Sequence, residues 1–345
     1  MNTVSNEGRT RVLTLRRALW VLLLVLIAGG LYLGLGSKTA PLAPVSTVTI
    51  AVPIQIGTAP TLVAAAHGLF AKTGVEVISQ PFELGKDALQ SLLKGHADLA
   101  LVADTPLLFA LLNGEDISIL AVTSQARRAL AVVGRKDRGI QRLQDLKGKS
   151  VGVTSGTNMT YFLDAMLQTY GIPSASVRLV DLDTSGVVKA LMAGDIDAAT
   201  LYQPFIGTVQ KQMGDQVNVF YGDDVYSYRV FLVGKTSYVD SHPQEIRRIL
   251  TALKAANQAI RADPAKARQT LAKAMQVDDG TLVHIFDTDT FTLSLDQAML
   301  LALDDQTRWA MQRGLVKARP VPNFLKSIKH QHLEAVVPDA VTIVH

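Results

Sequence analysis

Two separate stretches of this chain carry nearly the same succession of structural signals. Residues 92–106 read Leu-Leu-Lys-Gly-His-Ala-Asp-Leu-Ala-Leu-Val-Ala-Asp-Thr-Pro, and residues 191–204 read Leu-Met-Ala-Gly-Asp-Ile-Asp-Ala-Ala-Thr-Leu-Tyr-Gln-Pro. Each predicts a helix end, a glycine that terminates it, an aspartate turn, a short apolar strand, and a polar residue and proline where the strand ends. The repetition predicts two similar α/β lobes. The alternative is that Gly-x-x-Asp is ordinary punctuation between helix and strand.

The ends of these two predicted strands are candidate ligand-binding positions. In open α/β sheets, ligands bind outside the carboxyl ends of the strands. Asp104, Thr105, Tyr202 and Gln203 stand there. If the two lobes face each other, these side chains line a cleft from opposite sides.

The remainder of the globular chain alternates between strand and helix patterns, which is typical of mainly parallel α/β sheets. Residues 47–125 and 228–345 are expected to form lobe 1, and residues 126–227 lobe 2. Trp309 is expected in the core of a late helix. Strands are predicted at 48–52, 75–78, 117–123, 129–133, 150–153, 177–182, 217–221 and 228–233, and helices at 61–71, 87–94, 143–149, 159–170, 185–192, 245–262 and 295–314.

The amino terminus has the pattern of a membrane anchor. Residues 1–17 form a basic segment, residues 18–36 contain no charge, and residues 37–46 form a linker with two prolines. The uncharged stretch is long enough to cross a bilayer. By the positive-inside rule, the arginines that precede it are expected to remain in the cytoplasm. The bulk of the chain is then expected on the periplasmic or extracellular face. A cleaved signal peptide is the alternative.

Charge and cysteine content exclude several classes of protein. The formal charge of +4 is accounted for by residues 1–46, where four arginines and one lysine oppose one glutamate. The remaining chain is neutral, so the basic balance does not predict nucleic-acid binding. Because there is no cysteine, neither a lipid-modified terminus nor a structural disulfide is expected.

The loop Ser155-Gly156-Thr157-Asn158 is the most informative candidate site. It follows a predicted strand and precedes a helix, so backbone N–H groups and hydroxyls lie at a positive helix end. Such a loop suits sulfonate, sulfate, nitrate, carboxylate or phosphate. The alternative is a simple helix cap, in which Ser155 or Thr157 bonds its own helix.

The other candidate ligand residues follow other predicted strands. The equivalent loop after the first strand contains Gly57, Thr58 and Ala59. The alternative is that these residues only cap a helix that starts with Pro60. Glu83 and Asp104 could hold an amine, and Asp104 could instead be a helix cap.

Tyr202 offers an aromatic wall with a hydroxyl, and Gln203 offers a neutral donor and acceptor. Arg229 is a candidate anion clamp or a surface arginine.

The sequence offers little for catalysis. His330-x-His332 has no carboxylate at metal-ligand spacing, and there is no nucleophile elbow, phosphate-binding loop or cysteine nucleophile. A binding protein is therefore favoured over an enzyme, with no metal and no cofactor.

Several short motifs occur in an order and spacing that are specific together. They are His67-Gly68-Leu69-Phe70-Ala71-Lys72-Thr73-Gly74-Val75-Glu76-Val77, Gly95-His96-Ala97-Asp98-Leu99-Ala100, Asp145-Leu146-Lys147-Gly148-Lys149, Ser155-Gly156-Thr157, Gly194-Asp195-Ile196-Asp197-Ala198-Ala199 and His242-Pro243. In these motifs the chain resembles, over about residues 47–340, the periplasmic solute-binding proteins of ABC importers. The branch it resembles binds nitrate, taurine and aliphatic sulfonates and shares its fold with thiamine-pyrimidine binding proteins.

The resemblance implies a type II periplasmic-binding-protein clamshell whose hinge is two crossing strands. Its ligand would be a small anion, held by the loops named above and by Thr123-Ser124, so that Ser124 joins the candidate residues. The lobes would close around the solute and present it to a membrane permease driven by an ATPase. A monomer is expected.

Two departures from the family pattern leave alternatives open. Where many relatives have an aromatic residue, glutamate and proline, this chain has Tyr202-Gln203-Pro204, which weakens the case for an amine-bearing solute such as taurine. The apparent anchor opens the alternative of a membrane-anchored solute sensor that signals to a partner protein. A thiamine-pathway pyrimidine synthase that uses pyridoxal phosphate and a cysteine-rich segment is disfavoured, as is a purely structural clamshell.

Gly156→Asp is expected to abolish ligand binding and leave the fold intact.

Overall fold

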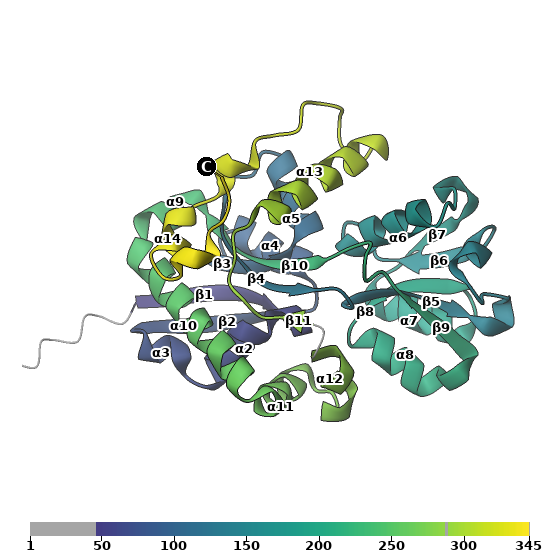
Figure 1. Cartoon of the computed structure of the whole chain (residues 1–345), viewed down its shortest axis with the longest axis horizontal. Helices are drawn as coiled ribbons and strands as arrows, with labels where there is room; N and C mark the ends of the chain where they lie inside the picture. The colour runs from purple at the N-terminus through teal and green to yellow at the C-terminus, as the bar shows by residue number, and fades with distance from the viewer. Residues whose placement is uncertain (1–45, 287–288, 345) are drawn as a thin grey trace, which may run out of the picture. The chain divides into compact units, whose positions relative to one another are not determined.

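The computed structural model describes residues 46–286 and 289–344 (Figure 1). The predicted basic segment and membrane helix, and the linker up to residue 45, lie outside the described residues. Within the described ranges, no helix is both long and apolar enough to span a bilayer. The chain from Ser46 onward forms one compact unit that contains two β-sheets.

The first sheet has six strands in the order β11-β4-β10-β3-β1-β2. β1 pairs in parallel with β2 and β3, whereas β10 runs antiparallel to both β3 and β4. Every residue of β3 is buried, which explains why its sequence, Leu-Ala-Leu-Val-Ala, does not alternate. The strands are β1 Ser46–Pro53, β2 Val75–Phe82, β3 Leu99–Ala103, β4 Ile117–Ala126, β10 Tyr228–Lys235 and β11 Asp289–Thr290.

The second sheet has five strands in the order β7-β6-β8-β5-β9. β6 pairs in parallel with β7 and β8, and β5 runs antiparallel to β8 and β9. The second sheet thus repeats the arrangement of the first. In this correspondence β6 matches β1, β7 matches β2, β8 matches β3, β5 matches β10 and β9 matches β4. The prediction of two similar α/β lobes is confirmed. The strands are β5 Leu130–Arg135, β6 Ser150–Val153, β7 Arg178–Asp181, β8 Ala198–Tyr202 and β9 Val217–Tyr221.

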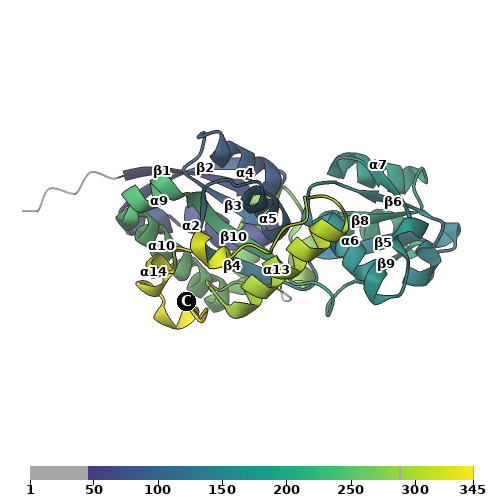
Figure 2. The ribbon, with the colours of Figure 1, turned by 90° about the horizontal axis from the view of Figure 1, so that it is seen from above.

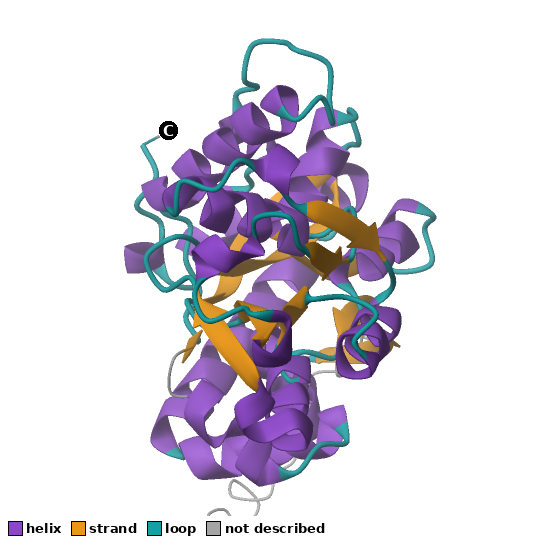
Figure 3. Ribbon diagram, turned by 90° about the vertical axis from the view of Figure 1, so that its right-hand side faces the viewer, coloured by secondary structure: helices purple, strands orange, loops and turns teal. Residues whose placement is uncertain are grey.

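Helices cover both sheets (Figure 3). We call the six-stranded sheet and its helices the first lobe, and the five-stranded sheet and its helices the second lobe. The helices of the first lobe are α2 Ala59–Ala66, α3 Leu69–Lys72, α4 Gly85–Leu93, α5 Asp104–Leu112, α9 Thr236–Ser241, α10 Pro243–Ala262, α11 Pro264–Met275, α12 Asp279–Phe286, α13 Gln297–Gln312 and α14 His330–Glu334. Those of the second lobe are α6 Asn158–Thr169, α7 Thr184–Ala193 and α8 Phe205–Met213.

Two chain segments connect the lobes. One joins β4 to β5 between Ala126 and Leu130, and the other joins β9 to β10 between Tyr221 and Tyr228. All strands of the first sheet come from residues 46–126 and 228–290, and all strands of the second come from residues 130–221. A chain that crosses twice between two sheets has the connectivity needed for a hinge.

Three sequence predictions are wrong. The predicted helix at residues 61–71 is two helices, α2 and α3, because Gly68 has a φ of 62° and ends the first of them. The predicted helix at 143–149 is a short 3₁₀ turn over Leu143–Leu146. Trp309 is only half-buried, and its contact with the second lobe is described below.

Candidate functional site

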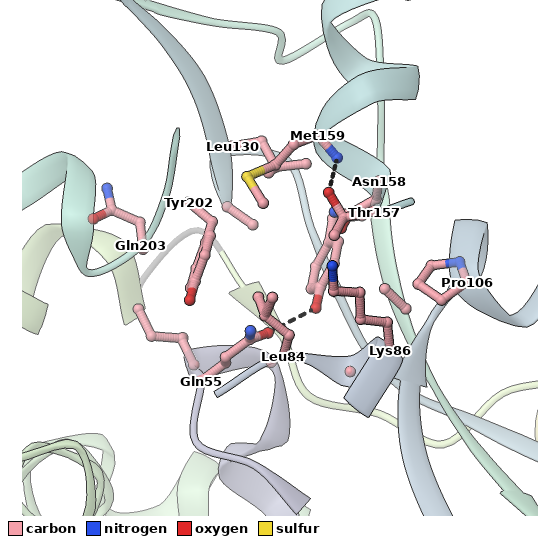
Figure 4. A pocket seen from close by; sticks show the side chains of 16 residues that line it. Gln55, Leu84, Lys86, Pro106, Leu130, Thr157, Asn158, Met159, Tyr202 and Gln203 are labelled. Carbon is pink, nitrogen blue, oxygen red and sulfur yellow. Dashed lines mark hydrogen bonds between the residues drawn. The ribbon is translucent and has the colours of Figure 1, made fainter. Parts of the chain in front are cut away.

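A cavity lies between the two lobes, at the carboxyl ends of β1, β3 and β8 (Figure 4). The first lobe contributes the loop after β1 and the start of α4, and the second lobe contributes the start of α6 and the end of β8. The cavity is lined by Gln55, Ile56, Gly57, Leu84, Gly85, Lys86, Ala103, Pro106, Ala129, Leu130, Thr157, Asn158, Met159, Tyr202, Gln203 and Tyr228.

The loop after β1 is fixed against β10 by Gly57 and Gln55. A Cβ atom on Gly57 would lie 2.7 Å from Val230 Cγ2, so only glycine lets the loop pack this closely. The Gln55 amide donates to the carbonyl oxygen of Glu83 at 2.9 Å. Its oxygen accepts from the Tyr228 hydroxyl at 3.1 Å, the bond drawn at Gln55 in Figure 4. Gln55 therefore presents a fixed polar surface to the cavity.

Lys86 is the cationic side chain of the cavity. It stands in the first turn of α4, and its Nζ donates across the cavity to the carbonyl oxygen of Ser155 in the second lobe at 3.4 Å. No described carboxylate forms an ion pair with it. Lys86 is not among the residues predicted from the sequence, because the sequence pattern places the start of this helix at Asp87 rather than at Gly85. The signal that could have found it is the Gly85-Lys86 pair, which follows the end of β2 at Phe82 after two intervening residues.

Two helix amino termini converge on the cavity. In α4, the N–H groups of Gly85 and Lys86 have no hydrogen-bond partner among the described residues, as geometry requires for the first residues of a helix. In α6, the Thr157 hydroxyl caps the helix by accepting from the Met159 N–H at 3.3 Å, so the helix-cap interpretation of Thr157 is correct. The N–H of Asn158 remains without a described partner. Unpaired N–H groups at helix starts favour an anion.

Ser155 and Gly156 lie at the edge of this arrangement. Ser155 is exposed, and its N–H donates to the Asp181 carboxylate at 2.9 Å. Gly156 has a φ of 74° and lines a neighbouring depression together with Lys86, next to the cavity itself.

Tyr202 and Gln203 form the wall from the second lobe. Tyr202 is 8% exposed, and burial raises the pKa of its hydroxyl, which therefore stays a neutral donor. Its ring packs edge-on against Phe205 at 5.1 Å between centroids. The Gln203 amide oxygen accepts from the Gly207 N–H at 3.3 Å, and the peptide bond to Pro204 is cis.

Neither predicted carboxylate lines the cavity. Glu83 is exposed beside it. Asp104 is 1% exposed and accepts from the Tyr226 hydroxyl, from the Gln306 amide at 2.9 Å and from the Thr105 N–H at 3.0 Å. Burial raises the pKa of Asp104, while these hydrogen bonds and the Arg229 charge oppose the rise. Within the part of the chain that the structure describes, no aspartate or glutamate lines the cavity.

Four other predicted residues are buried around the cavity rather than facing it. The Thr58 hydroxyl bonds the carbonyl oxygen of Pro53 at 2.6 Å, and the Ser124 hydroxyl bonds that of Gly57 at 2.6 Å. Thr105 donates to Gln306 at 2.7 Å, and Ala59 is the first residue of α2. The hydroxyls of Thr58, Ser124 and Thr105 thus bond within the protein. Arg229 follows Tyr228 on β10 and lines a different cavity.

The remaining walls of the cavity are apolar. Ile56, Leu84, Leu130, Met159 and Pro106 surround the polar groups. The space inside is about 30 Å³, which holds only a water or two. Among the described residues, no group of histidine, aspartate and glutamate side chains is arranged to hold a metal ion.

Comparison with known proteins adds a family and two named relatives. A family profile described as "NMT1/THI5 like" matches residues 55–267. A proposed binding protein of Brucella abortus is 27% identical over 234 residues, which cover 66% of this chain and 70% of that protein. The taurine-binding periplasmic protein of Escherichia coli is 28% identical over 165 residues, covering 48% of this chain and 51% of that protein.

Solved structures share the fold. The alkanesulfonate-binding protein of Xanthomonas axonopodis bound to MOPS has a TM-score of 0.72 at 17% identity, covering 84% of this chain and 99% of that one. The periplasmic aliphatic sulphonate binding protein of Escherichia coli has a TM-score of 0.71 at 21% identity, covering 80% and 95%. The desulfurization enzyme DszB has a TM-score of 0.66 at 17% identity, covering 85% and 99%. The two-lobed α/β fold of periplasmic binding proteins is therefore established, but it occurs in an enzyme as well as in binding proteins.

Proposed function

The chain belongs to the NMT1/THI5-like family, and we propose that it is the solute-binding component of an ABC importer that holds a small organic sulfonate between its lobes. One observation carries this proposal: Lys86 and the starts of α4 and α6 meet in a cavity that no carboxylate of the described residues lines. All three features favour a negative charge.

A sulfonate matches this set of donors because its three oxygens share one charge and can accept hydrogen bonds from several directions. The first lobe would supply Lys86 and the N–H groups of Gly85 and Lys86. The second lobe would supply the N–H of Asn158. An anion held from both sides is bound more tightly when the lobes are close, and this differential affinity drives closure.

The cavity walls favour an apolar substituent on the sulfonate. An alkyl or aryl group would contact Ile56, Leu84, Leu130 and Met159. The ammonium group of taurine would find no carboxylate among the lining residues, and nitrate would leave the apolar walls without a partner. We therefore place neutral-tailed sulfonates ahead of taurine and nitrate.

The partners of this function would be a membrane permease and its ATPase, with no cofactor. The membrane-anchored sensor is the second candidate, because residues 18–36 are uncharged and long enough to cross a bilayer. Both candidates use the same cavity. Deletion of the gene would separate them: loss of sulfonate uptake indicates an importer, whereas normal uptake with an altered response to sulfonate indicates a sensor.

Thermal unfolding of the purified protein tests the binding proposal. The panel would contain methane-, pentane- and benzenesulfonate, taurine, nitrate, sulfate, acetate, benzoate and a thiamine pyrimidine. A ligand at a hundred times its Kd stabilises the folded state by about 2.7 kcal/mol, which raises the melting temperature by several degrees. We expect such a rise with the alkyl and aryl sulfonates. A rise with only carboxylates or pyrimidines, or with none of the panel, would refute the sulfonate assignment.

A further inference from the structure

Arg229 lies on the opposite face of β10 from the cavity between the lobes. Neighbouring residues of a strand point to opposite faces, and Tyr228 faces that cavity. Arg229 is 7% exposed, and its Nη1 donates to the carbonyl oxygen of Ser227 at 3.2 Å. Its Nε is buried and has no hydrogen-bond partner among the described residues. A buried guanidinium with an unused donor is costly unless an acceptor from outside the protein satisfies it.

Arg229 lines a second cavity of about 370 Å³, which is within the usual range for small-molecule sites. Tyr161 of α6 contributes to it from the second lobe, and Asp305 of α13 from the first. Asp224, in the segment between β9 and β10, also lines it, as does Arg127 in the other segment that connects the lobes. A molecule bound here would contact both lobes and both connections.

The groups behind Arg229 are already satisfied within the protein. The Gln306 amide donates to Asp104 at 2.9 Å and accepts from Thr105 at 2.7 Å, and the Tyr226 hydroxyl donates to Asp104. The groups left for a ligand are therefore Arg229 Nε, the Arg127 guanidinium and the Tyr161 hydroxyl.

Tyr161 stays a donor over the physiological pH range. Burial, with Asp104 and Asp305 nearby, raises the pKa of its hydroxyl to about 12. No hydrogen bond of this hydroxyl to another described residue is present. The charge of Arg229 is close enough to the Tyr161 hydroxyl to oppose this rise in its pKa. Arg229 and Tyr161 thus form a donor pair for one end of a ligand.

Carboxylates supply the opposite charge at the rim. Asp223 is paired with Arg128 at 2.8 Å and is not available. Asp305 is 67% exposed and only loosely paired with Arg308 at 3.5 Å, and Asp224 has no described ion-pair partner. The cavity therefore offers two unused donors, the buried Arg229 Nε and the Tyr161 hydroxyl, close to the buried Asp104 carboxylate, and two exposed carboxylates, Asp224 and Asp305. A simple anion would be repelled by the carboxylates, whereas a zwitterion would satisfy both ends.

We propose that this second cavity binds a small zwitterion of the α-amino acid type. Its carboxylate would accept hydrogen bonds from Arg229 and Tyr161, and its ammonium group would face Asp224 and Asp305. This proposal is independent of the sulfonate assignment, because the two cavities share no lining residue.

Isothermal titration calorimetry of the whole protein tests it, with glycine, L-alanine and L-serine as zwitterionic probes and acetate and methylamine as probes of a single charge. We expect at least one amino acid to bind at least tenfold more tightly than acetate or methylamine. Arg229→Gln should weaken that binding at least tenfold, and Lys86→Met, in the other cavity, should leave it unchanged.

A further variant keeps the test decisive if Arg229→Gln does not fold. Asp305→Asn, at an exposed position, should weaken amino-acid binding several-fold while leaving acetate binding unchanged or stronger. The proposal is overturned if no amino acid binds at 10 mM, or if folded Arg229→Gln binds like the wild type. It is equally overturned if Lys86→Met abolishes the binding, since the amino acid would then occupy the cavity between the lobes.

Discussion

The guanidinium of Arg313 lies 2.8 Å from the carboxylate of Asp164 and so connects the end of α13 in the first lobe to α6 in the second. The indole N–H of Trp309 donates to the same carboxylate at 2.9 Å. The Trp309 ring also packs against Phe109 of the first lobe and Tyr161 of the second, and α13 lies beside both lobes (Figure 2). This contact links the lobes in addition to the two connecting segments.

Asp164→Ala should lower the free energy of unfolding by about 2 kcal/mol, because it leaves the Trp309 N–H and the Arg313 guanidinium without their acceptor. The Asp164 side chain is only 7% exposed, so water cannot fully replace the carboxylate. Urea unfolding measures the change. Asp304→Ala is the matched control. The Asp304 side chain is 34% exposed and pairs with Arg308, also on α13, at only 3.8 Å, so its loss should cost less than about 0.5 kcal/mol. Equal losses in the two variants would contradict a role for the interlobe contact.

Lys86→Met should weaken sulfonate binding at least tenfold, about 1.4 kcal/mol, if the proposed function is right. The variant removes the cationic side chain of the cavity and its contact with Ser155, but retains the aliphatic part of the side chain. Calorimetric titration with pentanesulfonate measures the loss. Lys94→Met removes the same charge at the other, exposed end of α4 and should bind as the wild type does. Similar losses in both variants would mean that overall charge, rather than Lys86, determines affinity.

Gly156→Asp should abolish sulfonate binding while the protein remains folded. Gly156 has a φ of 74°, where a side chain strains the backbone, but no atom lies within 4 Å of an added Cβ, so the cost is only about 1 kcal/mol. The new carboxylate would stand beside Lys86 and repel an anion. Gly156→Asn is the control, because asparagine has nearly the same shape, tolerates this conformation and carries no charge. If both variants bind sulfonate alike, the loop is not an anion site.

The sequence was sufficient to predict local features of the site, but not the pairing of distant segments. The loop Ser155-Gly156-Thr157-Asn158 predicts a helix from residue 159 and leaves a cap by Ser155 or Thr157 as the alternative to an anion site; the structure begins α6 at Asn158 with Thr157 as its cap. Asp104 was expected in the cleft as a strand-end carboxylate, yet its partner Gln306 lies 202 residues further along the chain, and no local pattern reveals that contact. Trp309 was assigned to the core for the same reason, since its partner Asp164 belongs to the other lobe.

The repeated Gly-x-x-Asp unit was predictable because its turn signals are local and occur twice, although each aspartate contacts a strand 49 or 47 residues earlier in the chain. Asp98 Oδ2 accepts from the Thr49 N–H at 2.7 Å, and Asp197 Oδ2 accepts from the Ser150 N–H at 2.8 Å. In both lobes the aspartate after the glycine turn thus fixes the start of a central parallel strand to its neighbour. The resemblance between the two stretches is structural and does not depend on a ligand.

This shared contact predicts a pH-dependent contribution from Asp197. Burial raises the pKa of its carboxyl, but hydrogen bonds from the Ser150 N–H and hydroxyl outweigh that effect, so the pKa lies below its usual 3.8. A lowered pKa stabilises the folded state above pH 3.8, and this contribution is lost as the pH falls through the folded-state value. Asp197→Asn should therefore cost about 1 kcal/mol of unfolding free energy at pH 7, limited by partial exposure, and less at pH 3, where the unfolded-state carboxyl is mostly protonated.

Urea unfolding of the wild type and Asp197→Asn at pH 7, 5 and 3 measures this difference. Asp195→Asn is the matched control, because Asp195 is exposed two residues earlier and its side chain makes no hydrogen bond with the described residues. The control should follow the wild type at every pH. A difference between Asp197→Asn and wild type that persists unchanged at pH 3 would show that the aspartate acts through its shape rather than its charge, and the electrostatic account of the repeated turn would be wrong.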